Sequence, residues 1–159
     1  MDFKLIKKII DDTAEKNGIK EYEIYNSEFE SVSADTLGNE ISSFSSSVSG
    51  GICFRCRIDG KMGYASTELF EEDELNSLVL RAAENAKSME KEDSVGIFEG
   101  SPSYEKTNVP VFTPLTADEV KTVALDIQKK TYAASDKVVD GTSAGVQAGT
   151  ATVRIANSN

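Results

Sequence analysis

The spacing of apolar residues along the chain predicts three amphipathic helices. The first covers Asp2–Asn17, where apolar side chains recur at helical spacing and Gly18 is a natural stop. The second covers Glu71–Met89 and opens on an acidic run, which suits the positive end of a helix dipole. The third opens at Thr116 with Thr-Ala-Asp-Glu, the pattern of a capping box.

Between the first two helices, alternating apolar and polar residues predict an antiparallel β-meander. The clearest strand is Gly51–Ile58, and Asp59-Gly60 is a strong hairpin turn into a returning strand, Lys61–Thr67. One face of the clearest strand carries Ile52, Phe54, Cys56 and Ile58, and the other carries Cys53, Arg55 and Arg57. Shorter strand-like runs precede it at Tyr22–Ile24, Phe29–Ala34 and Ile41–Val48.

The later part of the chain changes in character. All three prolines fall within about 93–115, which reads as a linker. After the third helix, two strands are predicted over Thr142–Gln147 and Thr150–Ala156, joined at Ala148-Gly149. One helix and one strand pair cannot build a core of their own. We therefore predict an α+β fold with a first domain over 1–92, a linker over 93–115, and a truncated second region over 116–159.

Charge and composition exclude several classes of protein. Seventeen Lys+Arg against twenty-seven Asp+Glu give the 159-residue chain a net charge of −10, which repels phosphate backbones and argues against a nucleic-acid partner. No apolar stretch approaches the ~20 residues of a membrane span, and the beginning of the chain lacks a signal peptide's apolar region and cleavage site. We therefore expect a cytoplasmic protein with no membrane partner.

The chain contains no histidine, which removes His-dependent triads and His-ligated metal sites. Its two cysteines, Cys53 and Cys56, have CxxC spacing, but on a strand residues three apart point to opposite faces and cannot share a metal ion. The serine run Ser42–Ser49 has no histidine to activate a hydroxyl. Arg55 and Arg57 could contact an anion, although pairing with nearby glutamates is the commoner arrangement. The residues thus indicate no catalytic, cofactor-binding or metal site in this chain.

The segment Gly51–Thr67, followed by a helix ending in Ala82-Ala-Glu-Asn-Ala-Lys87, resembles the N-terminal domain of the TldD/PmbA family. These proteins are called modulators of DNA gyrase and are zinc-protease-like. The shared pattern is a glycine, an arginine in an apolar strand, a Gly turn and Gly-x-Ala-Ser-Thr. Cys53 departs from it, because many members carry a second glycine there. The closing residues Val153–Asn159 resemble a strand near the start of the family's central region.

The resemblance implies an oligomeric, bacterial-type protein about three times as long as this chain. Proteolytic members carry a His-Glu-x-x-x-His helix that binds zinc, and nothing in this chain matches it, so the resemblance implies zinc only for a longer assembly. The features of the linker and the serine run resemble the PmbA/TldE branch, which lacks the zinc motif and pairs with a TldD-type subunit.

Two functions follow as expectations from the resemblance. The first is a scaffold and substrate-cleft domain in a zinc-dependent peptide-processing assembly, partnered by a TldD-type subunit or by self-association, with a peptide as substrate. This chain alone would then not be an enzyme. The alternative is a non-enzymatic interaction module that regulates a topoisomerase or another cytosolic protein.

Overall fold

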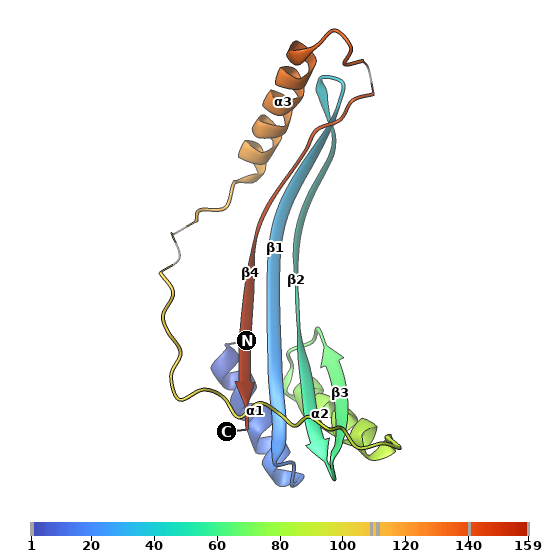
Figure 1. Ribbon diagram of the computed structural model, residues 1–159, viewed down its shortest axis with the longest axis vertical. Coiled ribbons are helices and arrows are strands. Elements are labelled where there is room, and N and C mark those ends of the chain that lie inside the picture. The colour runs from blue at the N-terminus through green and yellow to red at the C-terminus, as the bar shows by residue number, and fades with distance from the viewer. Residues whose placement is uncertain (1, 109, 111, 140, 159) are drawn as a thin grey trace. The chain divides into compact units, whose positions relative to one another are not determined.

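The computed structural model describes residues 2–108, 110, 112–139 and 141–158. Three helices accompany a sheet with strand order β3-β2-β1-β4, so the predicted α+β class is confirmed (Figure 1). The elements in chain order are α1 (Phe3–Lys16), β1 (Glu21–Leu37), β2 (Glu40–Ile58), β3 (Lys61–Thr67), α2 (Glu72–Ser88), α3 (Ala117–Ala134) and β4 (Gly145–Asn157).

Contacts group the chain into two compact units that interleave along the sequence. Unit 1 consists of Met1–Ser27, Gly50–Thr107 and Val153–Asn159, and unit 2 consists of Glu28–Ser49 and Asn108–Thr152. β1, β2 and β4 each contribute residues to both units, because these strands are long. The boundaries at 92 and 115 that we predict from the sequence follow composition along the chain, and they remain a separate prediction.

Unit 1 has an apolar core between its strands and two helices. Tyr22 and Ile24 of β1 and Ile52, Phe54 and Cys56 of β2 are buried, and the Tyr22 and Phe54 rings lie 5.4 Å apart. The helices add the apolar face that their spacing predicted, namely Ile6, Ile10 and Ala14 from α1 and Leu75, Leu78, Val79, Ala82, Ala83 and Ala86 from α2. The predicted faces of β2 are therefore confirmed.

The hairpin between β2 and β3 also forms where its turn residues place it. Asp59 and Gly60 have φ values of 50° and 78°, the left-handed conformation that a two-residue type I′ turn requires at both positions. The antiparallel register runs from Ile58 opposite Lys61 to Ile52 opposite Thr67. The sequence reading of this hairpin is confirmed.

Unit 2 has a much smaller core. Its buried apolar cluster consists of Ala34 from β1 and Val120 and Ala124 from α3. The capping box at Thr116 is present, since its hydroxyl accepts from the Glu119 N–H and its own N–H donates to the Glu119 carboxylate. Gln128 is buried on the same helix, and its side-chain amide donates to the Thr142 carbonyl at 2.6 Å.

The strands are longer than the sequence predicted, which corrects three expectations. β1 runs without a break through Tyr22–Ile24 and Phe29–Ala34, and β2 likewise joins Ile41–Val48 to Gly51–Ile58. β4 is one strand, so the expected turn at Ala148-Gly149 was wrong. A Cβ at Gly149 would collide with the Glu30 carbonyl of β1. The glycine thus permits a close approach of two strands where we had expected a turn.

Candidate functional site

The arginines of β2 are paired with glutamates of β1. The Nε atom of Arg55 lies 3.0 Å from the Glu23 carboxylate, and Nη1 of Arg57 lies 3.5 Å from that of Glu21. This is the pairing of neighbouring strand-face charges that we considered the commoner arrangement. These two ion pairs stabilise the face of the sheet opposite the helices. Both guanidinium groups are already paired with carboxylates, so they do not form a site for an anion.

A segment after α2, Glu92–Phe98, crosses the same face of unit 1. The Met62 N–H donates to the Asp93 carboxylate at 2.7 Å, the Asp93 N–H donates to the Gly60 carbonyl at 2.9 Å, and Ile97 is buried. These contacts anchor residues that the sequence reading had placed at the start of a linker. The contacts of Asp93 therefore hold the Asp59-Gly60 turn and the edge of β3 that faces away from β2.

The two cysteines lie on opposite faces of β2, as the strand periodicity predicted. Cys56 is buried in the core, and burial raises the pKa of its thiol to about 11. Burial also raises the pKa of the half-buried Cys53, although Arg55 acts in the opposite direction. Both thiols are therefore protonated at neutral pH, and they do not face a common ligand.

A hollow of about 560 Å³ lies beside the last strand within unit 1. The Asn157 side-chain amide closes one side by donating to the Phe98 carbonyl at 2.7 Å. The lining combines aromatic rings, an aliphatic side chain and two carboxylates, which come from Phe98, Tyr104, Ile155, Glu23 and Glu99. No pair of catalytic groups converges there among the described residues.

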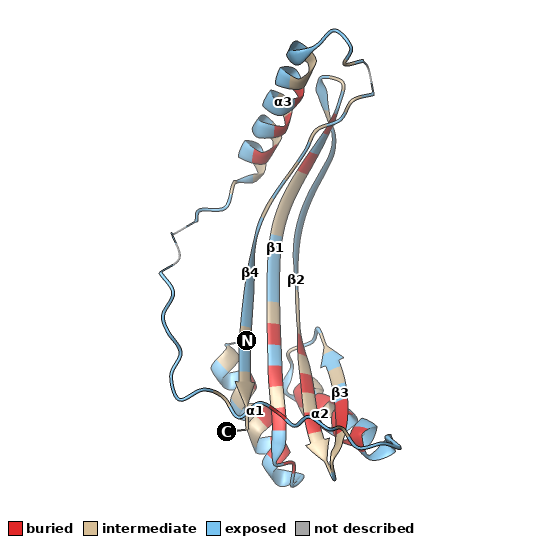
Figure 2. Cartoon of the chain, in the orientation of Figure 1, coloured by how far each residue is buried: buried red, intermediate tan, exposed pale blue. Residues whose placement is uncertain are grey.

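The serine run lies on an exposed part of β2 in unit 2. All of Ser42–Ser49 is exposed, and the Ser31 and Ser47 hydroxyls share a hydrogen bond of 3.0 Å between β1 and β2. Figure 2 shows this part of β2 as a continuous exposed stretch. Because these serine hydroxyls form hydrogen bonds to the neighbouring strand β1, the run acts here as a strand surface. β2 continues through Gly50-Gly51, so the run lies inside one strand and does not end in a turn there.

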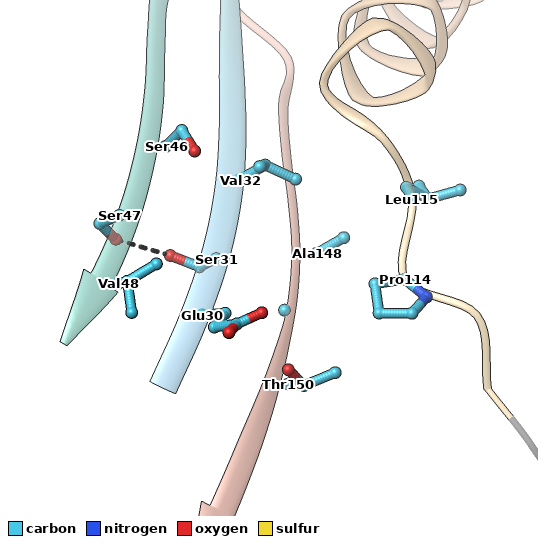
Figure 3. Close-up of a pocket in the computed structure, with 11 residues that line it drawn as sticks. Glu30, Ser31, Val32, Ser46, Ser47, Val48, Pro114, Leu115, Ala148 and Thr150 are labelled. Carbon is cyan, nitrogen blue, oxygen red and sulfur yellow. Dashed lines mark hydrogen bonds between the residues drawn. The ribbon is translucent and has the colours of Figure 1, made fainter. Parts of the chain in front are cut away.

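A small hollow of about 200 Å³ lies over these strands in unit 2 (Figure 3). Val32 and Ala148 extend toward the side on which Pro114 and Leu115 lie. Its lining is aliphatic and hydroxyl-bearing, with Glu30 as the one carboxylate among the lining residues. Such a surface suits contact with another polypeptide better than acid–base chemistry.

One side of β2 is open in unit 2. β3 pairs with β2 from Ile52 to Ile58, so Glu40–Ser49 has a strand neighbour only in β1 within the described part of the chain. The sequence reading missed this edge because it divided β2 into two strands. β2 has 19 residues and β3 has 7, and this difference in length exists only because β2 is one continuous strand.

Neither metal binding nor membrane crossing has structural support. In the described ranges, no three Cys, Asp or Glu side chains cluster as metal ligands would. None of the helices found there is both long enough and apolar enough to span a bilayer.

Comparison with known proteins identifies the central segment. Residues 22–86 match the family model described as PmbA/TldA metallopeptidase domain 1. This segment matches the first domain of the PmbA/TldD-type metallopeptidases. The resemblance carried by Gly51–Thr67 and Ala82–Lys87 is thereby confirmed. A search of curated proteins gave no match.

Solved structures share the fold over nearly the whole chain. A candidate modulator of a DNA gyrase from Thermotoga maritima matches 98% of this chain at 19% sequence identity, with a TM-score of 0.80. A second candidate modulator, from Bacteroides thetaiotaomicron, also matches 98% of the chain, at 16% sequence identity and with a TM-score of 0.75. TldE from Thermococcus kodakarensis matches 94% of this chain at 22% sequence identity, with a TM-score of 0.55. The chain covers 34–36% of these proteins, about a third of their length.

Proposed function

We propose that this chain is the first, non-catalytic domain of a PmbA/TldD-type protein of the cytoplasm, in the TldE-like branch. It supplies sheet surface to a zinc-dependent assembly that processes peptides. The observation that carries the proposal is the match of residues 22–86 to a metallopeptidase first domain. The partner is a TldD-type subunit or a second copy of the chain.

The structure of unit 2 supports a role in assembly. Its buried apolar cluster has only three members among the described residues, whereas Phe44 and Val48 of β2 are 41% and 78% exposed. A sheet with so small a core and such exposed side chains gains stability from a covering surface. A neighbouring subunit or an enclosed peptide would provide that surface.

The residues present do not fit a zinc site. Zinc needs three or four converging thiolate, imidazole or carboxylate ligands, and the chain has no histidine. Its thiols lie on opposite strand faces and are protonated at neutral pH. Zinc and the hydrolytic step therefore belong to other parts of the assembly, and this chain contributes binding and support.

Reconstitution tests the proposal. The chain is mixed with a purified zinc-bearing TldD-type subunit, and hydrolysis of an unstructured fluorogenic peptide is followed with and without a zinc chelator. We expect a stable complex, chelator-sensitive hydrolysis by the mixture, and none by the chain alone. A mixture that neither associates nor gains activity over the partner alone would refute the proposal.

The gyrase modulators among the structural relatives favour one second candidate, a non-enzymatic regulator of a topoisomerase. Its test is a gyrase supercoiling assay with and without the chain. A dose-dependent change in supercoiling, together with no gain of peptidase activity, would favour this second function. The net charge of −10 argues that any such effect acts on the enzyme rather than on DNA.

A further inference from the structure

The open side of β2 in unit 2 is built to accept another strand. Glu40–Ser49 pairs with β1 on one side and with no described strand on the other, which leaves alternate N–H and C=O groups without a ladder partner. We propose that this edge binds an extended, basic polypeptide segment by β-augmentation. The inference rests on the proposed function and names the surface and the charge of the segment that it recruits.

The outer side of β3 shows how this chain protects an edge. There the Met62 N–H donates to the Asp93 carboxylate, and the Tyr64 carbonyl accepts from the Asn85 side chain at 2.7 Å. Two polar side chains thus occupy groups that another strand would use. Because side chains from outside the sheet occupy these two groups, β3 is partly protected as an edge.

The edge of β2 lacks the usual protective devices. The stretch Ile41–Ser49 contains no lysine, no other charged residue and no proline, which are the residues that blunt natural edge strands. Six of its nine side chains are serines, which are small enough to let a second backbone approach, and the other three are Ile41, Phe44 and Val48. A strand that is long, uncharged and exposed on both faces is a template for pairing.

Side chains beside this edge provide specific contacts for alternate residues of an added strand. Phe44 and Val48 have even positions and share one face of β2, on which the hollow of Figure 3 also lies. The Lys121 ammonium lies 4.3 Å from the centre of the Phe44 ring. Aliphatic side chains of an incoming strand would pack against Val48 and the exposed part of this ring.

Charge decides which segment is favoured. The chain has a net charge of −10, and Glu40 and Glu30 lie at the start of β2 and in the hollow. Neither glutamate has an ion pair among the described residues. A basic segment is therefore attracted at long range, whereas a second copy of this acidic chain is repelled.

The experiment measures binding of a labelled peptide with alternating lysine and valine to the full chain by fluorescence anisotropy. Single N-methyl groups are placed at successive peptide positions. In β-augmentation only alternate peptide amides donate to the protein strand. We therefore expect N-methylation to weaken binding about fivefold or more at every second peptide position and to have little effect at the positions between. An equal effect at all positions would refute pairing through the backbone.

Matched variants locate the site. Ser45→Lys places a cation on the open edge of β2, and Ala151→Lys places the same charge on exposed β4 in unit 2. We expect Ser45→Lys to weaken binding about threefold to fivefold, Ser45→Glu to strengthen it, and Ala151→Lys to leave it within twofold. Loss with Ala151→Lys alone would place the peptide on β4, which overturns the inference and leaves the proposed function standing.

Two further outcomes also count against the edge. If sedimentation shows a dimer that Ser45→Lys converts to a monomer, then a second copy covers the edge and the basic segment does not. If the reconstituted assembly hydrolyses peptides but the chain binds no basic peptide, the inference fails while the proposed function stands. Failure of reconstitution, with peptide binding intact, would instead refute the proposed function alone.

Discussion

Replacing Gly63 by alanine tests a close approach of α2 to β3 in unit 1. Gly63 lies opposite Cys56 in the β2–β3 register and faces α2. A Cβ there would collide with the Ala82 carbonyl oxygen and the Ala86 N–H, and would lie 2.8 Å from the Ala86 Cβ. Backbone atoms cannot turn aside as a flexible side chain can, so the helix itself must move.

The structure sets the size of the expected effect. Ordinary contact begins at 3.4 Å, so the Ala86 Cβ must retreat by about 0.6 Å and the helix backbone by more. Overpacking of this kind costs about 1–3 kcal/mol, and a backbone clash belongs at the upper end. Alanine recovers about 0.5–1 kcal/mol because it restricts the unfolded chain. We expect a net loss of roughly 2 kcal/mol in the free energy of unfolding.

Urea unfolding followed by circular dichroism measures this loss. With an m-value of about 1–3 kcal/mol/M, a loss of roughly 2 kcal/mol lowers the urea midpoint by about 0.7–2 M. Gly96→Ala is the matched control, since its Cβ would meet no atom closer than 3.6 Å and its φ is not in the left-handed region. We expect the control to stay within about 0.5 kcal/mol of the wild type. Equal stability of the Gly63 and Gly96 variants would refute the packing argument.

Three other predictions follow from the same structure. Phe54→Ala should cost about 3–5 kcal/mol in urea unfolding because the ring is fully buried, whereas Arg57→Ala should cost well under 1 kcal/mol; equal costs would mean that the faces of β2 are reversed. Hydrogen bonds from the backbone and side chain of Thr116 lower the pKa of Glu119 in the folded state. The stabilisation of the fold by ionised Glu119 is therefore present above the ordinary glutamate pKa of 4.5 and is lost as the pH falls through the folded-state pKa. Glu119→Gln should therefore flatten the acid side of the stability profile, and an unchanged profile would contradict this. A maleimide reagent should modify Cys53 before Cys56 in the native chain, as peptide mass spectrometry would show, and equal rates would contradict the burial of Cys56.

Local signals in the sequence were enough to predict parts of the fold. Asp59-Gly60 predicts its own turn because both residues tolerate positive φ, and Thr116 with Glu119 predicts its own cap because the partners are three residues apart. The alternation around Phe54 predicts the core face of β2, because a half-buried strand requires it. Each of these features is determined within a few residues of the chain.

Features that depend on distant partners could not be predicted in this way. Gly149 resembles a turn residue in the sequence, but the neighbouring Glu30 backbone is what requires a residue without a side chain there. The serine run has weak strand propensity, and its inclusion in one long β2 depends on pairing with β1. Asp93 and Asn85 act on β3 through contacts that no short-range pattern reveals. The open edge of β2 follows from the same long-range pairing.

The position of β4 beside β1 has a consequence for the order in which the protein folds during synthesis. The Thr36 N–H donates to the Ala144 carbonyl across 108 residues of chain, and the Ser158 N–H donates to the Tyr22 carbonyl. At about 5–20 residues per second, a ribosome needs about 5–20 s to make the residues between the first two partners. β1, β2 and β3 with their helices can assemble in that interval, while the side of β1 that receives β4 stays unpaired. The nascent chain therefore exposes a temporary strand edge, and this is the interval in which a chaperone or a wrong strand would compete with β4.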